Sequence, residues 1–172
     1  TLHYRTCETK GMFELVAVGN DIEAAVNVSS KLDGVCYLAD PADERALAFR
    51  TLVRCVTDSP QDLHSAAGYG MYFVFSRVIR ERNTGVESGV PSPGITAIFP
   101  LLHHPNRTHE QSDAHWRDVH APLALQHHPG MWDYTQLSVS RTLTGPAVDG
   151  FALVSFESME SMKERFFGDE ND

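Results

Sequence analysis

Two stretches of the chain carry the same order of strand-like and helix-like segments, and this repetition constrains the fold more than any other feature. In the first stretch, apolar runs and helical periodicity assign residues 13–19 (strand), 22–32 (helix), 35–38 (strand), 46–56 (strand), 59–68 (helix) and 71–79 (strand). In the second, they assign residues 95–102 (strand), 109–127 (helix), 132–139 (strand), 150–156 (strand) and 159–167 (helix). This order predicts an α+β fold of two ferredoxin-like β-α-β-β-α-β repeats, the second without its last strand.

A segment rich in glycine, proline and serine, residues 83–94, separates the two repeats and has no periodicity. We therefore expect a degenerate ferredoxin-like half at residues 11–82 and a second half at residues 95–172. Such a unit places both helices on one face of its sheet, so the bare faces of two sheets can cover each other. The halves are expected to form the α+β barrel that dimeric proteins build, which encloses either packed side chains or one small ligand.

The charge balance and the cysteines narrow the function classes. A formal net charge of −9 disfavours nucleic acid and anionic lipid as partners, because both require a cationic patch. Strand arginines such as Arg54 and Arg77 are scattered, and we interpret them as solvated. The three cysteines lack paired spacing, and no apolar run reaches the ~18 residues of a membrane span. The simplest expectation is a cytoplasmic protein with no nucleic-acid or membrane partner.

The densest chemical segment lies in the second half of the chain. Of the nine histidines, most fall in this one segment: His103, His104, His109, His115, His120, His127 and His128. A capping box at residues 108–111 begins a helix within it. In that helix, Trp116, Val119, His120 and Leu123 occur at i, i+3, i+4 and i+7. This spacing predicts one helical face, with His120 inside an apolar stripe that faces the barrel.

Pro122 interrupts the same helix. Proline has no N–H group and cannot donate to the carbonyl of Asp118, so we expect the helix to bend or loosen at this point. A freed carbonyl beside a half-buried His120 favours a polar pocket.

The sequence HWRDVHAPL at residues 115–123 resembles the helix of the EthD-like family, whose pattern is an aromatic residue, Trp, three residues, His, one residue, Pro and Leu. Further matches to the family are YTQ at 134–136, LTGP at 143–146 and GFA at 150–152. The resemblance covers residues 95–167, whereas residues 11–82 fit only as a degenerate half. It implies a dimeric α+β barrel. The wider superfamily includes polyketide cyclases, lactone isomerases, cofactor-free monooxygenases, decarboxylases and some haem proteins. His115 stands where the family often has the aromatic residue.

The resemblance implies functional roles for Trp116, His120 and Tyr134. Because an imidazole titrates near neutral pH, His120 is predicted to be a general acid/base, and His115 is a second candidate. Tyr134 is predicted to donate a hydrogen bond to a developing enolate or phenolate oxygen, and Trp116 to stack on an aromatic substrate. This set predicts cyclisation, isomerisation or decarboxylation of a small aromatic or polyketide-like molecule without a cofactor.

Large side chains are expected to line the ligand space. The predicted substrate-binding residues are Trp116, Leu123, Phe99, Phe75 and Gln136. The phenylalanines expected inside the barrel are Phe49, Phe73, Phe75, Phe99, Phe151 and Phe156. Aromatic residues in strands often belong to the core, so the alternative is that they fill the barrel.

Other interpretations remain open. One is that His120 is a core histidine bonded to a backbone carbonyl. Another is a haem or metal-dependent oxidoreductase, in which His103-His104 and His127-His128 meet at the helix ends. We expect no metal site, because the H-x-x-x-H spacing of a metal-binding helix is absent. A third is a non-catalytic small-ligand binding protein. A homodimer is also possible, since barrels of this kind often form between two chains.

Overall fold

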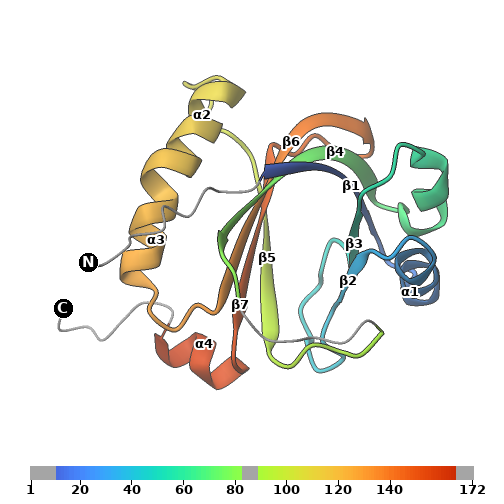
Figure 1. Ribbon diagram of the computed structural model, residues 1–172, viewed down its shortest axis with the longest axis horizontal. Helices are drawn as coiled ribbons and strands as arrows, with labels where there is room; N and C mark the ends of the chain where they lie inside the picture. The colour runs from blue at the N-terminus through green and yellow to red at the C-terminus, as the bar shows by residue number, and fades with distance from the viewer. Residues whose placement is uncertain (1–10, 83–88, 166–172) are drawn as a thin grey trace, which may run out of the picture.

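A computed structural model describes residues 11–82 and 89–165 and shows an α+β fold around one antiparallel sheet that curls into a nearly closed barrel (Figure 1). Its strands are β1 (Gly11–Gly19), β2 (Val35–Leu38), β3 (Thr51–Cys55), β4 (Gly70–Arg80), β5 (Ile95–Leu101), β6 (Asp133–Thr144) and β7 (Gly150–Phe156). Their order in the sheet is β2-β3-β1-β4-β6-β7-β5. The predicted linker positions 83–88 and the predicted end of the last half, 166–172, lie outside the described residues.

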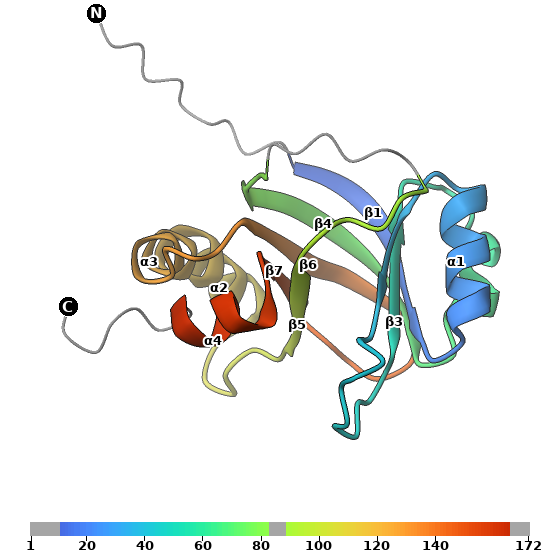
Figure 2. The ribbon, with the colours of Figure 1, turned by 90° about the horizontal axis from the view of Figure 1, so that it is seen from below.

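Helices cover the outer face of the barrel on two sides (Figure 2). They are α1 (Ile22–Lys31), the 3₁₀-helix η1 (Pro60–Ala66), α2 (His109–His115), the π-helical turn η2 (Trp116–His120), α3 (Ala121–His127) and α4 (Met159–Arg165). α1 and η1 lie on the β1–β3 side, while α2, α3 and α4 lie on the β5–β7 side. The predicted capping box is confirmed, because Thr108 and Gln111 exchange side-chain-to-backbone hydrogen bonds at the start of α2. No helix in the described ranges has the length and apolar character needed to cross a membrane.

Two strands differ from the predicted bounds by more than two residues, and pairing explains both. The strand predicted at 46–56 is shorter, since Thr51 pairs with Gly19, the last residue of β1, and no partner strand lies beyond it. β6 runs further than predicted, to Thr144, because β4 continues to pair with it as far as Met71. Available partners set strand length here, and the local sequence does not report them.

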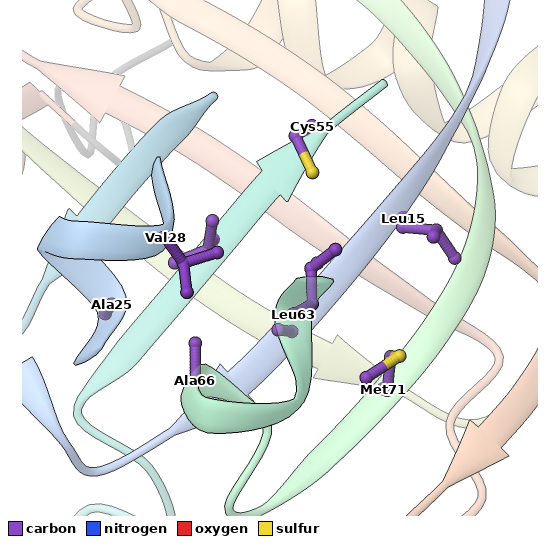
Figure 3. Packing of buried hydrophobic residues seen from close by; sticks show 9 residues of the cluster. Leu15, Ala25, Val28, Cys55, Leu63, Ala66 and Met71 are labelled. Atoms are coloured by element: carbon purple, nitrogen blue, oxygen red, sulfur yellow. The ribbon is translucent and has the colours of Figure 1, made fainter. Parts of the chain in front are cut away.

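Buried apolar residues form three layers that follow the alternation of the strands. One layer lies between the sheet and α1 with η1, and includes Leu15, Ala25, Val28, Cys55, Leu63, Ala66 and Met71 (Figure 3). A second fills the barrel interior with Val16, Val18, Leu52, Tyr72, Val74, Leu137, Val139, Phe151 and Leu153. A third lies beneath α3 and α4, with Ala121, Ala124, Met131, Tyr134, Ala152, Val154 and Phe156. Packed side chains of this second layer, and not a ligand space, therefore fill most of the barrel interior.

The prediction that six phenylalanines line the barrel is wrong for most of them. Phe151 lies in the interior, and Phe49 packs against that layer. The others point outward: Phe73 toward the α1 layer, Phe75 toward Phe13, Phe99 toward solvent and Phe156 toward the helices. Successive strand residues point to opposite faces, so inward-facing Tyr72 and Val74 on β4 force their phenylalanine neighbours outward.

A buried ion pair occupies part of the interior. Glu14 and Arg54 lie on the same faces of their strands as Val16 and Leu52. Two guanidinium nitrogens of Arg54, Nε and Nη2, donate to the two Glu14 carboxylate oxygens at 2.7 and 2.7 Å, and Nη2 also donates to Ser76 Oγ at 3.1 Å. Glu14 is only 5% exposed. The interpretation of Arg54 as a solvated strand residue is therefore wrong: its charge is compensated by a partner forty positions earlier in the chain.

Candidate functional site

The helical segment between β5 and β6 changes its hydrogen bonding at Trp116. The backbone N–H of Ala121 donates to the carbonyl of Trp116, five residues earlier, which makes residues 116–120 a π turn. Pro122 follows and cannot make the α-helical bond to Asp118, as the sequence predicted. The wider turn and the missing bond are therefore adjacent in the chain. π turns inside α-helices occur frequently at functional sites.

This turn overturns the predicted packing face. An α-helix advances about 100° per residue, so one additional residue in a turn rotates everything after it. Val119 and Leu123 are 44% and 47% exposed, and His120 is also exposed. The expectation that these three share an inward stripe with Trp116 is therefore wrong. The residues of this segment that pack against the sheet are Trp116, Ala121, Ala124 and Leu125.

Three of the predicted site residues do come together beneath this turn. The Trp116 indole Nε1 donates to the Tyr134 hydroxyl oxygen at 2.9 Å. The Gln136 side-chain amide donates to that same oxygen at 3.0 Å and to the backbone carbonyl of Trp116 at 3.1 Å. A Cβ atom at Gly150 would lie 2.7 Å from the indole ring, so only glycine leaves room for Trp116 here. Trp116, Tyr134 and Gln136 form what we call the tyrosine cluster.

The hydroxyl of Tyr134 has an unusual hydrogen-bonding state. Its oxygen accepts from two N–H donors, which occupy both lone pairs. Burial raises the pKa of Tyr134, outweighing the opposite effect of its hydrogen bonds to Gln136 and Trp116. The phenol is therefore protonated at neutral pH, and no acceptor within the described residues takes its proton. Two donors on one hydroxyl oxygen polarise the O–H bond, so Tyr134 is a preorganised hydrogen-bond donor.

A buried ion pair adjoins the tyrosine cluster and was missed by the sequence reasoning. Arg77, which is 4% exposed, binds Asp113 on α2 through both terminal guanidinium nitrogens, one of them at 3.0 Å. Burial acts to raise the pKa of Asp113, but hydrogen bonds from Arg77 and Ser138 outweigh it and hold the pKa below the usual range. The Arg77 guanidinium also lies 5.9 Å from the Trp116 ring. The interpretation of Arg77 as a solvated strand residue is therefore wrong.

Two histidines meet at one aspartate at the start of α2. The Nδ1 atoms of His103 and His109 lie 2.9 and 2.9 Å from the two carboxylate oxygens of Asp149, and the backbone N–H of His103 donates to Asp149 at 2.7 Å. Burial acts to raise the pKa of Asp149, but these contacts hold it below the usual range. The cluster joins the β5–α2 loop, helix α2 and the turn between β6 and β7.

The two histidine pairs at the ends of this helical segment do not converge. His103 and His104 precede α2, whereas His127 and His128 lie at the end of α3. The helical segment between the two pairs is about 28 Å long at 1.5 Å per residue. The predicted meeting of these pairs is therefore wrong. In the described parts of the chain, no group of three or more His, Cys, Asp or Glu side chains is arranged to hold a metal ion.

The two predicted acid/base residues lie on the exposed side of the helix. His115 and His120 are both exposed. Partial burial of the ring lowers the pKa of His120, and the nearby His115 and His128 lower it further. His120 is therefore mostly neutral at pH 7 and available to accept a proton. The structure does not place it against the Tyr134 hydroxyl.

The other predicted substrate-binding residues lie apart from one another. Leu123 is exposed on α3, and Phe99 is 42% exposed on the edge strand β5. Phe75 is half-buried on the outer face of β4 and packs edge-on against Phe13, with 5.1 Å between the ring centroids. None of the three takes part in the hydrogen bonds of the tyrosine cluster.

Comparison with models of known protein families gives no match for this chain. None of the curated proteins matches it either. The resemblance to the EthD-like family therefore rests on the residues of the second half, with the sequence at 115–123 at its centre.

Proposed function

We propose that the protein is a cofactor-independent enzyme of the EthD-like type, which transfers a proton on a small aromatic or polyketide-like molecule. The order of strands supports the underlying fold. In a β-α-β-β-α-β unit the first and third strands pair, as β1 pairs with β3 and β5 with β7. The two halves then join side by side through β4 and β6. This is the arrangement expected of two ferredoxin-like halves that share one barrel.

The hydrogen-bonding state of Tyr134 is the observation that carries the proposal. A hydroxyl that accepts two N–H bonds and keeps its own proton free suits one task, which is donation to an oxygen that gains negative charge. Burial in low-dielectric surroundings strengthens such a bond. The neighbouring Trp116 offers an aromatic face to a planar substrate.

The proposed reaction removes a proton from carbon next to a carbonyl group. His120, neutral at pH 7 because its pKa is lowered, accepts that proton. The electron pair moves onto the carbonyl oxygen, where Tyr134 donates its hydrogen bond to the enolate. The protonated imidazole then returns the proton to a new position, or the enolate attacks a second carbonyl. His115 is the alternative base on the same exposed side of the helix.

Hydrogen–deuterium exchange tests this step without knowledge of the natural substrate. Ketones that carry an aromatic ring, such as 2-tetralone, are incubated with the protein in D₂O, and loss of the α-proton signal is followed by NMR. We expect exchange above the buffer rate, and Tyr134→Phe should lower it by roughly 10²-fold or more, the effect of one oxyanion donor. Tyr72→Phe is a matched control, because Tyr72 is also fully buried but its hydroxyl donates to the carbonyl of Pro146 in the turn between β6 and β7.

A non-catalytic small-ligand binding protein is the second candidate. The exposed position of His120 is the observation that favours it. Ketone binding without accelerated exchange in the same NMR experiment would select this candidate and refute catalysis. Unchanged exchange in Tyr134→Phe would refute the assigned role of Tyr134.

A further inference from the structure

Two buried polar atoms beneath α2 have no hydrogen-bond partner within the residues that the structure describes. They are Nε of Arg77 and Oε1 of Gln136. Both side chains are almost completely buried, with 4% and 0% of their surface exposed. Unpaired buried donors and acceptors are rare in native proteins, and each requires an explanation.

These two atoms belong to neighbouring residues. Arg77 and Gln136 are direct partners across the β4–β6 pair, an arrangement that places Cβ atoms about 5 Å apart. The terminal nitrogens of Arg77 are fixed by Asp113. One unpaired N–H donor and one unpaired carbonyl acceptor therefore belong to two buried side chains that are direct neighbours across this strand pair.

The orientation of the Gln136 amide is fixed by its surroundings. Its nitrogen donates to the carbonyl of Trp116 and to the hydroxyl of Tyr134. Exchanging nitrogen and oxygen would place the amide oxygen against the Trp116 carbonyl, and two acceptors do not bond. Oε1 is thus the atom left without a partner.

A hydroxyl group matches this pair of atoms. Its oxygen accepts from Nε of Arg77 and, through its second lone pair, from the free O–H of Tyr134, while its own proton goes to Oε1 of Gln136. An anion fits poorly, because Asp113 already compensates the charge of Arg77 and because the Gln136 oxygen requires a proton on its partner. An ether or a ketone lacks that proton.

The geometry points to recognition of a neutral phenolic or enolic hydroxyl of the substrate between Arg77 and Gln136. The inference rests on the proposed function for the use of the tyrosine cluster as a substrate site, and it names the group that binds beside Tyr134. A phenol and an enol share the required chemistry, an O–H group on unsaturated carbon.

Matched aromatic probes test the inference by binding alone. 2-Naphthol has the donor and the acceptor, whereas 2-methoxynaphthalene keeps the oxygen and loses the proton. Both are titrated into the protein at pH 7 and followed by isothermal calorimetry. We expect 2-naphthol to bind about tenfold more tightly, the ratio that one additional hydrogen bond typically gives.

Two variants each remove one of the unpaired atoms. Gln136→Met removes the acceptor, and Arg77→Lys removes Nε while keeping a cation against Asp113. Each should reduce the preference for 2-naphthol to near unity, and the second serves if the first does not fold. Gln126→Met is the control, because Gln126 is an exposed glutamine on α3, and it should keep the preference.

Equal affinity of the wild-type protein for the two probes would overturn the inference. So would a wild-type protein that binds neither probe, or a preference that survives in a folded Gln136→Met or Arg77→Lys variant. These outcomes are separate from those of the exchange experiment. A protein that prefers 2-naphthol but does not exchange α-protons would keep the hydroxyl site and lose the catalytic proposal.

Discussion

Replacing Arg54 by Met should destabilise the protein by about 3–5 kcal/mol, because it leaves the Glu14 carboxylate inside the barrel without a counter-charge. Glu14 is 5% exposed, so water compensates little of the lost bidentate contact. Ser76 loses a donor in the same change. For a chain of this length each kcal/mol corresponds to a shift of about 2–4 °C, so the melting temperature should fall by roughly 6–20 °C.

Urea denaturation followed by circular dichroism measures this effect in Arg54→Met, Glu14→Leu and the double variant. Replacing both partners by apolar side chains is often neutral, so the double variant should be far more stable than the sum of the single effects implies. Arg45→Met is the control. Arg45 pairs with Asp43 on the surface, and losing that pair should leave the unfolding midpoint nearly unchanged. A cost below about 1 kcal/mol for Arg54→Met, or strictly additive single effects, would refute the reasoning.

Two further predictions concern the site and its surroundings. Gly150→Ala places a methyl group 2.7 Å from the Trp116 ring and should displace the indole from Tyr134. Changed tryptophan fluorescence and slower α-proton exchange would show this displacement. An exchange rate equal to that of the wild-type protein would contradict it. The second prediction concerns Asp149. Burial acts to raise the pKa of this carboxyl group, but its contacts with His103 and His109 outweigh burial and hold the pKa below the usual range. Its contribution to stability is full above about pH 4, the unfolded-state value, and is lost as the pH falls through the lower folded value. Asp149→Asn should therefore flatten the fall of the urea midpoint on acidification, and an unchanged fall would exclude this role.

Much of the fold could be predicted from local patterns, because strands and helices here have ordinary signals. The apolar runs at residues 150–156 and 35–38 became strands with the expected bounds. The tyrosine cluster could also be predicted in part from the sequence. Tyr134 and Gln136 are two positions apart on one strand and so share a face, and the motif drew attention to Trp116.

Local sequence patterns could not predict which face of the helix points inward, nor that two arginines are buried. A hydrophobic period assumes α-helical geometry, and the π turn at Trp116 breaks that assumption without an unambiguous sequence signal. The burial of Arg77 depends on Asp113, which lies thirty-six positions away in the chain. Contacts between residues so far apart in the chain depend on how helices and strands pack. The local sequence around either residue does not reveal that packing.

The π turn also bears on which sequence changes this region tolerates. The π turn places five residues where an α-helical turn places four, and it thereby brings Ala121 and Ala124 to the same side as Trp116. Deletion of one exposed residue from this turn, such as Val119, would leave Ala121 four positions after Trp116, and an ordinary α-helical turn would then keep both alanines against the sheet. Insertion of one residue would instead rotate α3 by about 100° and carry both alanines away from the sheet. This segment should therefore tolerate the loss of one residue better than the gain of one.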